Sequence, residues 1–377
     1  MKYILLIFTT FFLFLGCSKE PKVVKNTTYI KELPRTKLIK TEFSKLPNWE
    51  NGSYKKALYN FLYSCKTSKT RKLYKNLCKK GKNSTLNPKL FIESEFTPYE
   101  IISKDGLDEG LLTGYYEPEL KGSLTKTKIY KYPIYETPKD LVTVDLGSIY
   151  PKLKDYRLRG RVVDNKLIPY YTREESLSKK IPAKVICYTD SKIDLFFLEI
   201  QGSGRVTLDD GRIIFIGFDN QNGHRYRAIG RYLVKIGALE IQDVSLQTIR
   251  KYLDENPSKV DEVLNYNKSV VYFKQRKKPA SGSLGVELTP MRSVAVDRRY
   301  IPLGAMLYLS STIRDRKIER VVFAQDTGGA IKGAIRADMF LGHTKEAMEI
   351  AGELKSPLKL WILLPKKERY ESYIRKI

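Results

Sequence analysis

Three aspartates in the C-terminal part of the chain stand where acid–base chemistry could occur. Asp297 and Asp326 end the largely apolar segments 293–297 and 321–326, and Asp338 lies twelve residues beyond Asp326. A carboxyl group with apolar neighbours has a raised pKa, which is what a general acid needs. Aspartates at strand ends also begin turns or cap helices, so position alone leaves a structural role open.

The residues after Asp326 would let a ligand approach its carboxyl group. They are Thr327, Gly328, Gly329 and Ala330. Glycine has no side chain to obstruct a close approach. Asp326 is therefore the first candidate for a catalytic acid/base, ahead of Asp297 and Asp338.

Other chemistries fit the sequence poorly. The glycine-rich turn 202–204 precedes a predicted strand and hairpin, whereas a phosphate loop precedes a helix. Ser203 has no nearby histidine to act as its base. The only histidines are His224 and His343, and no CxxC pair exists, so we expect no zinc or iron site and no cofactor.

Tyrosines are abundant, with 26 in 377 residues. Tyrosine rings can stack on sugars, but most β-proteins bury them, and both interpretations stay open. The tyrosines concerned are Tyr115, Tyr116, Tyr132, Tyr135, Tyr170 and Tyr171.

The formal net charge of +26 is spread along the chain. A nucleic-acid partner is not expected, because no helix-turn-helix, ribonucleoprotein or zinc-finger pattern accompanies the charge. A basic surface instead favours encounter with anionic polymers or lipid head groups. The length favours two domains, and 42% hydrophobic residues supply a sizeable core.

The N-terminus carries a targeting signal. Lys2 precedes an apolar run over 4–15, which is shorter than the roughly 20 residues of a membrane-spanning helix and is typical of a signal peptide. The segment 13–17 resembles a bacterial lipoprotein box, in which Cys17 would be acylated and become the mature N-terminus. Ser18 resembles the signal for the outer membrane. The alternative is an ordinary secretion signal in which Cys17 has no role.

Three further cysteines are present. Cys65 and Cys78 could form a disulfide in an oxidising periplasm or remain two buried thiols. Cys187 lies in an apolar run and is predicted to belong to the core.

Strands dominate the predicted elements. We expect strands at 111–116, 129–134, 159–163, 185–188, 194–201, 212–218, 293–297, 305–309, 320–326 and 358–364. In the strand 194–201, Phe196, Leu198 and Ile200 would share one face and Gln201 the other. Residues 210–211 would form a hairpin turn.

Helices are expected in four places. They are 54–63, 226–236 with Gly237 after its end, a helix capped by Ser245 that stops before Pro257, and 344–354. A further short helix would open at Ser258. The segment 79–87 is predicted to be a loop.

Several blocks of this sequence resemble the membrane-bound lytic murein transglycosylase A family. The blocks, which follow the family's order, are 114–118 (GYYEP), 132–135 (YPIY), 197–204 (FLEIQGSG), 222–226 (NGHRY), 288–297 (LTPMRSVAVD) and 325–333 (QDTGGAIKG). They span roughly residues 110 to 365, and the region before about residue 85 matches little.

The resemblance implies a mainly β fold with a few helices. A double-psi β-barrel domain would be formed by two segments, 46–121 and 267–377, and a second β domain, 122–266, would be inserted between them. The signal peptide 1–16 and a lysine-rich tether, 17–45, would precede them. A groove between the two domains would hold a glycan strand.

The resemblance also implies roles for residues. Asp326 would be catalytic, with Asp297 and Asp338 as supporting carboxylates. Substrate-binding positions would be Gly114, Tyr115, Tyr116, Glu117, Gln201, Gly202, Ser203, Gly204, Thr327, Gly328, Gly329 and Ala330. The roles of Glu117 and Glu199 stay open, because family members vary there.

The implied reaction needs a single carboxylate. Hydrolytic glycosidases use two, whereas a lytic transglycosylase lets the muramic acid's own C6 hydroxyl attack, which yields a 1,6-anhydro end. The implied partners are peptidoglycan glycan strands, the outer membrane through Cys17, and other cell-wall enzymes, with a monomeric chain facing the periplasm. Two alternatives are a hydrolase of the same glycan and a lipoprotein that binds glycan without cutting it.

The lipid anchor can be tested by removing its thiol. We expect Cys17→Ser to move the protein from the membrane fraction to the soluble fraction, because no acyl chain can be attached. Fractionation and immunoblotting would measure this, and a variant that stays in the membrane would contradict lipidation.

Overall fold

The computed structural model describes residues 36–153, 156 and 158–366, so the predicted signal peptide and Cys17 lie outside the described residues. Strands predominate, with helices between them, as predicted. Within these ranges, no helix is both long and apolar enough to cross a membrane.

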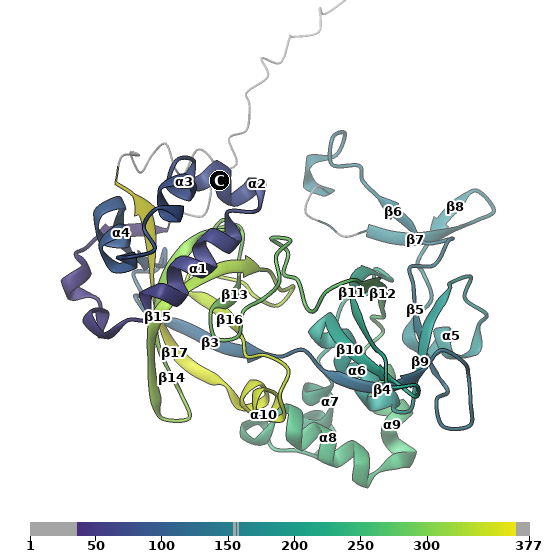
Figure 1. The fold of residues 1–377 in the computed structure, drawn as a ribbon. Coiled ribbons are helices and arrows are strands. Elements are labelled where there is room, and N and C mark those ends of the chain that lie inside the picture. The colour runs from purple at the N-terminus through teal and green to yellow at the C-terminus, as the bar shows by residue number, and fades with distance from the viewer. Residues whose placement is uncertain (1–35, 154–155, 157, 367–377) are drawn as a thin grey trace, which may run out of the picture. The chain divides into compact units, whose positions relative to one another are not determined.

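The first sheet closes into a barrel (Figure 1). Its strands, in spatial order, are β1 (Lys37–Lys40), β2 (Phe96–Ile102), β17 (Lys355–Pro365), β14 (Met306–Ile313), β15 (Arg316–Asp326), β13 (Ser293–Val296), β16 (Arg336–Phe340) and β3 (Gly110–Tyr115). Closure occurs because β17 pairs with β14 and also, through its first residues, with β3. The strands β1, β2 and β3 come from before residue 121 and the other five from after residue 267, so the prediction of a barrel built from two segments is confirmed.

The chain between the two barrel segments forms further sheets. One has the order β12 (Val271–Arg276), β11 (Ile213–Gln221), β10 (Ser203–Leu208), β4 (Glu119–Ser123), β9 (Val185–Thr189) and β5 (Tyr132–Tyr135). The other is β6 (Val142–Val144), β7 (Leu158–Val163) and β8 (Lys166–Ile168). The predicted turn at 210–211 joins β10 to β11, which pair antiparallel.

Helices near the N-terminus pack on the barrel. They are α1 (Tyr54–Ser64), α2 (Ser68–Tyr74), α3 (Leu77–Lys82) and α4 (Pro88–Glu95). Buried residues of these helices, such as Phe61, share one apolar core with barrel residues such as Phe323. A disulfide joins Cys65 to Cys78, and Cys187 is buried as predicted.

Two predictions for the N-terminal part are corrected. The folded body begins earlier than residue 46, because β1 pairs antiparallel with β2 inside the predicted tether. The predicted loop 79–87 is helical as far as Lys82. Gly81 is buried there, and a Cβ atom on it would lie 3.2 Å from Leu62 Cδ2, so this glycine allows close helix packing rather than ending the helix.

The remaining helices are α5 (Arg173–Ser178), α6 (Lys192–Gln201), α7 (Ile229–Lys235), α8 (Leu246–Glu255), α9 (Val260–Asn265) and α10 (Lys345–Glu353). The prediction of a helix capped by Ser245 is confirmed by α8, because the Ser245 side chain accepts a hydrogen bond from the N–H of Thr248. Gly237, with φ +71°, follows α7 as predicted.

The prediction of a strand over 194–201 is wrong, because α6 occupies these residues. The Ser191 side chain caps the helix by accepting from the N–H of Asp194 at 3.0 Å, and Gly202 ends it with φ +77°. Phe197 and Leu198 are both buried, but they join different apolar clusters. A short apolar run that is buried on two sides shows no helical period.

The disulfide should stabilise the helices that pack on the barrel. We expect the double change Cys65→Ala and Cys78→Ala to lower the free energy of unfolding by about 2–4 kcal/mol, since the unfolded chain loses a cross-link. Denaturant unfolding would measure this. A reducing agent should destabilise the wild type but not the variant; equal sensitivity of both would contradict the expectation.

Candidate active site around Asp326

The Asp326 carboxyl group is held by hydrogen bonds on both oxygens. Oδ1 accepts from the N–H of Thr327 at 2.8 Å and from the N–H and hydroxyl of Ser283, both at 2.9 Å. Oδ2 accepts from the hydroxyl of Tyr115 at 3.0 Å. The side chain is half-buried at the end of β15. The carboxyl group is therefore oriented by the protein while it keeps contact with solvent.

The barrel register aligns Asp326 with Asp338. Ala295, on β13, pairs with Asp326 of parallel β15 and with Asp338 of antiparallel β16. Asp338 in turn pairs with Thr113 on β3. Strands are spaced by about 4.8 Å, so the Cα atoms of the two aspartates are roughly 10 Å apart. Two carboxyl groups thus lie on one row of the barrel, with a small alanine between them.

Asp338 lies in a less polar environment than a surface carboxylate. Burial raises the pKa of Asp338, and the negative charge of Asp326 adds to this, while Thr113 and Arg336 oppose it. The Thr113 hydroxyl donates to Oδ1 of Asp338 at 2.5 Å. Asp338 therefore keeps its proton to a higher pH than an exposed aspartate would.

Tyr115 links the end of β3 to Asp326. Its ring is buried with Ala280, Ala295, Ile331 and Phe340. Burial raises its pKa well above the usual value, and the charge of Asp326 raises it further. The hydroxyl therefore keeps its proton and remains a donor to Asp326. Of the two interpretations left open for the tyrosines, burial describes Tyr115, whose side chain is 9% exposed.

The loop that contains Ser283 was missed by the sequence analysis. Leu284 N–H donates to the carbonyl of Gln325 at 2.9 Å, which places the loop against the end of β15. A Cβ atom on Gly282 would lie 2.2 Å from the same carbonyl oxygen, so only glycine permits this approach. The glycine and serines of 281–283 are typical of a turn, a signal that was not used, and nothing in the sequence indicates which strand the turn meets.

Glu117 connects this loop to the inserted sheet. Its side chain accepts from the N–H of Ala280 at 2.8 Å and forms an ion pair with Arg205 at 2.5 Å. Glu117 is 1% exposed, and its oxygens are occupied by these donors. The contacts indicate a structural role for a residue that was predicted to bind substrate.

Glu199 also has a structural environment. It forms two hydrogen bonds with the guanidinium of Arg173, at 2.7 and 2.8 Å, and accepts from the N–H of Val271 at 3.0 Å. These bonds join α5, α6 and the start of β12.

The two predicted substrate-binding blocks before residue 205 meet each other. The N–H of Tyr116 donates to Oε1 of Gln201 at 3.3 Å. A Cβ atom on Gly204 would lie 2.9 Å from the carbonyl oxygen of Pro118, so this glycine lets β10 pack against that segment. Gly202 and Ser203 are half-buried, and Ser203 pairs with Gly217 on β11.

Gly114 and Tyr116 are packed against protein. A Cβ atom on Gly114 would lie 2.6 Å from Leu341 Cδ1, and the Tyr116 side chain is 4% exposed. Burial raises the pKa of Tyr116 to about 12. Both residues hold the end of β3 in place.

The segment after Asp326 is the more accessible part of the site. The Thr327 hydroxyl lies 2.8 Å from that of Ser283. Gly328 accepts from the N–H of Ile331 at 3.2 Å, which forms a turn, and Gly329 and Ala330 are exposed on it. This turn is open to a ligand.

Asp297 holds the loops beside β13 in place through hydrogen bonds. It accepts from the Arg299 guanidinium, at 2.6 Å to Nη2, and from the N–H of Gly333 at 3.0 Å. Burial tends to raise the pKa of Asp297, but these hydrogen bonds outweigh it and hold the pKa below its usual value. Asp297 is thus an ionised anchor for the turn that follows Asp326.

No metal centre accompanies these carboxylates in the part of the chain that the structure describes, where no group of three or more His, Cys, Asp and Glu could hold a metal ion.

Two family models match this chain. Residues 111–274 match the MltA specific insert domain, and residues 292–364 match the 3D domain. The chain is 33% identical over 262 residues to membrane-bound lytic murein transglycosylase A of Escherichia coli strain K12, which covers 67% of this chain and 64% of that protein. The match therefore spans slightly less than two thirds of the relative's length.

Solved structures extend the similarity. The crystal structure of MltA from Neisseria gonorrhoeae has a TM-score of 0.78 and 31% identity, over 89% of this chain and 92% of that chain. The lytic transglycosylase LtgG of Burkholderia pseudomallei has a TM-score of 0.61 and 32% identity, over 88% of this chain and 96% of that chain.

The environment of Asp297 predicts a pH-dependent stability. We expect Asp297→Ala to lower the free energy of unfolding at pH 7 by about 1.5–3 kcal/mol, because hydrogen bonds to the charged group are lost. The depressed pKa means that this stabilisation is complete above the usual value of 3.8 and is lost as the pH falls through the folded-state pKa.

Denaturant unfolding at pH 7 and at pH 3 would check this. The difference between wild type and variant should shrink at the lower pH. The matched change at exposed Asp254 should have little effect at either pH. A difference for Asp297→Ala that grows on acidification would contradict the assignment.

Proposed function

Because this chain belongs to the MltA family, we propose that it is a lytic transglycosylase of peptidoglycan. It cleaves the β-1,4 bond between N-acetylmuramic acid and N-acetylglucosamine and leaves 1,6-anhydromuramic ends. The relatives named above are lytic transglycosylases by name. The observation that carries the proposal is the oriented, solvent-accessible carboxyl group of Asp326 at the end of a barrel strand.

Asp326 acts as both acid and base through Oδ2. The N–H groups of Ser283 and Thr327 at Oδ1 can only donate, so a proton on the carboxyl group resides on Oδ2. This proton passes to the glycosidic oxygen as the bond from C1 to that oxygen breaks. The carboxylate then takes the proton of the muramic C6 hydroxyl as O6 bonds to C1. The ring closes, and the acid is restored.

Tyr115 supports the ionised stage of this cycle. Its hydroxyl donates to Oδ2, where the negative charge develops when the proton leaves. The buried ring also fixes the direction of the donor. The nucleophile is part of the substrate, so little further entropy is lost when it attacks.

Asp338 and Asp297 are supports rather than a second catalytic group. Asp338 lies two strands away from Asp326 and accepts a hydrogen bond from Thr113. Asp297 accepts hydrogen bonds from Arg299 and Gly333. Neither arrangement leaves a carboxylate aimed at a water beside Asp326. This favours a transglycosylase over a hydrolase, which needs such a partner.

The glycan contacts are proposed at the accessible turn 327–330 and at the half-buried residues 201–203. Four of the predicted substrate-binding residues instead pack against protein and support the site: Gly114, Tyr116, Glu117 and Gly204. A lipid anchor at Cys17, facing the periplasm from the outer membrane, would hold the enzyme near the wall. The relatives' designation as membrane-bound supports membrane association.

Product analysis with Asp326→Asn tests the proposal. The variant should cleave peptidoglycan at least about 10²-fold more slowly, because general acid–base catalysis contributes about 10²–10⁴-fold. Wild-type digests should contain anhydromuramic ends by mass spectrometry. Asp315→Asn, at an exposed aspartate in the turn before β15, is the matched control and should cleave like the wild type.

Three outcomes would each contradict part of the proposed function. Reducing muramic ends, one water heavier than anhydro ends, would indicate a hydrolase. Unchanged cleavage by Asp326→Asn would remove Asp326 from the mechanism, and no cleavage by the wild type would favour a glycan-binding lipoprotein.

A further inference from the structure

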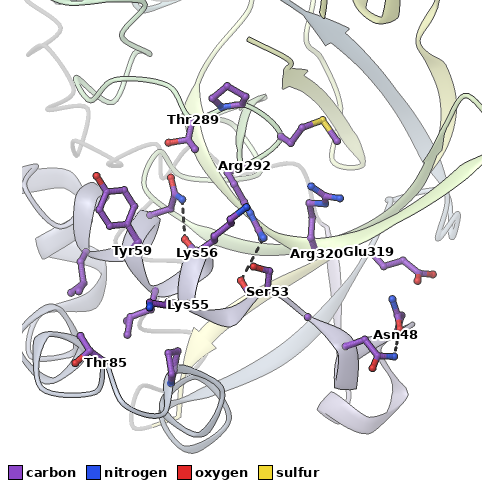
Figure 2. A pocket seen from close by; sticks show the side chains of 18 of the residues that line it. Asn48, Ser53, Lys55, Lys56, Tyr59, Thr85, Thr289, Arg292, Glu319 and Arg320 are labelled. Carbon is purple, nitrogen blue, oxygen red and sulfur yellow. Dashed lines mark hydrogen bonds between the residues drawn. The ribbon is translucent and has the colours of Figure 1, made fainter. Parts of the chain in front are cut away.

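A cavity of about 1120 Å³ lies away from Asp326, where α1 and the turn before it meet the barrel (Figure 2). Its barrel side consists of residues 289–292 and 317–320, which precede β13 and form the first half of β15. Arg320 and Asp326 are both on β15, six residues apart, which is about 20 Å at roughly 3.3 Å per residue. The cavity is thus distinct from the candidate active site.

Two arginines in this cavity lack an acidic partner. Arg292 is 6% exposed, and within the described part of the chain its side chain donates only to carbonyl oxygens, those of Val321 at 2.7 Å and Ser53 at 3.4 Å. Among the described residues, neither Arg292 nor Arg320 forms an ion pair, and the buried Nε of Arg320 has no hydrogen-bond partner. Glu319 also lines the cavity, but Figure 2 shows it directed away from Arg320.

The two guanidinium groups repel each other. Burial lowers the pKa of Arg292 to about 10, and the charge of Arg320 contributes to this. Burial lowers the pKa of Arg320 as well. Placing like charges together without a counter-charge is costly unless an anion joins them. Carboxylate and phosphate are the groups that a guanidinium binds through two parallel hydrogen bonds.

The α1 side of the cavity adds further binding groups. Lys55 and Lys56 are exposed at the start of α1, and Ser53 makes no capping hydrogen bond there. The positive end of the helix dipole therefore adds to the basic charge around the cavity. Tyr59, which is 65% exposed, offers a ring surface.

The cavity also contains a buried acceptor. Asn60 is 2% exposed, and its Nδ2 donates to the carbonyl of Lys56 at 2.9 Å. Its Oδ1 has no hydrogen-bond partner within the described residues. A buried acceptor without a donor is unfavourable. The N–H group of a peptide ligand would satisfy it.

We propose that this cavity binds a carboxylated peptide, with the Arg292 and Arg320 guanidinium groups on the carboxylate and Asn60 Oδ1 accepting from a peptide N–H. Given the proposed function, the available ligand of this chemistry is the stem peptide of peptidoglycan. It could be bound while attached to the glycan or after release as a free peptide. The enzyme would then hold the wall polymer at a point separate from Asp326.

Isothermal titration calorimetry with the full-length chain in detergent tests this. The probes are a disaccharide stem peptide that has no bond cleavable by the proposed reaction, the same peptide without sugar, and inorganic phosphate. We expect the peptide probes to bind and Arg320→Gln to weaken them roughly tenfold or more, as expected for a charge-assisted hydrogen bond. The ratio of the affinities for the two peptide probes shows whether the ligand is the glycan-attached stem peptide or the free peptide.

Variants separate this effect from loss of folding. Arg320→Gln removes an Nε that has no internal partner among the described residues and also removes a like charge beside Arg292, so its thermal unfolding temperature should not fall below that of the wild type. Lys56→Gln, on the exposed face of α1, should weaken binding by a smaller factor. Arg316→Gln, exposed on the same strand and outside the cavity, is the matched control and should bind like the wild type.

The outcomes are independent of the catalytic proposal. Arg320→Gln should form anhydro ends from peptide-free glycan at the wild-type rate, and Asp326→Asn should bind the peptide probes normally. Equal peptide affinity in wild type and Arg320→Gln would overturn the proposal. So would binding of phosphate with no binding of either peptide.

Discussion

The pairing of β13 with both of its neighbours is the constraint on which the candidate site depends. Parallel pairing with β15 and antiparallel pairing with β16 bring Asp326 and Asp338 to either side of Ala295. Parallel strands cannot be joined by a tight turn, and the chain accordingly passes through β14 between β13 and β15. A shift of one residue in either pairing would turn one carboxyl group to the opposite face.

A second requirement is that the loop 280–285 reaches the end of β15. Ser283 and Thr327 then fix Oδ1 of Asp326, and Tyr115 approaches Oδ2 from β3. The same loop receives Glu117, which is ion-paired with Arg205 of the inserted sheet. A buried ion pair is weak evidence for stability, but this one connects the inserted sheet with the groups around the carboxyl.

The basic character of the chain has two different physical meanings. Most of the lysines are exposed, and they provide long-range attraction for an anionic wall or membrane. Arg292 and Arg320 are different because they are buried or half-buried and line the same cavity as an unsatisfied amide oxygen, that of Asn60. The net charge of +26 does not distinguish these cases, whereas the folded structure does.

The sequence by itself determined a mainly β chain, most of the strands, the helices signalled by caps such as Ser245, and Asp326 as the leading candidate. These features are local: they follow from period, caps and an ordered set of motifs. It left the pairing of Cys65 with Cys78 open, and it predicted a strand where α6 forms, because alternation in a short apolar run fits either state. Only the tertiary structure decided that Ser283 reaches Asp326, that Glu117 is buried in an ion pair, and that Arg292 and Arg320 share a cavity. Each of these contacts joins residues far apart in the chain, and no local pattern encodes which distant partner a side chain will meet.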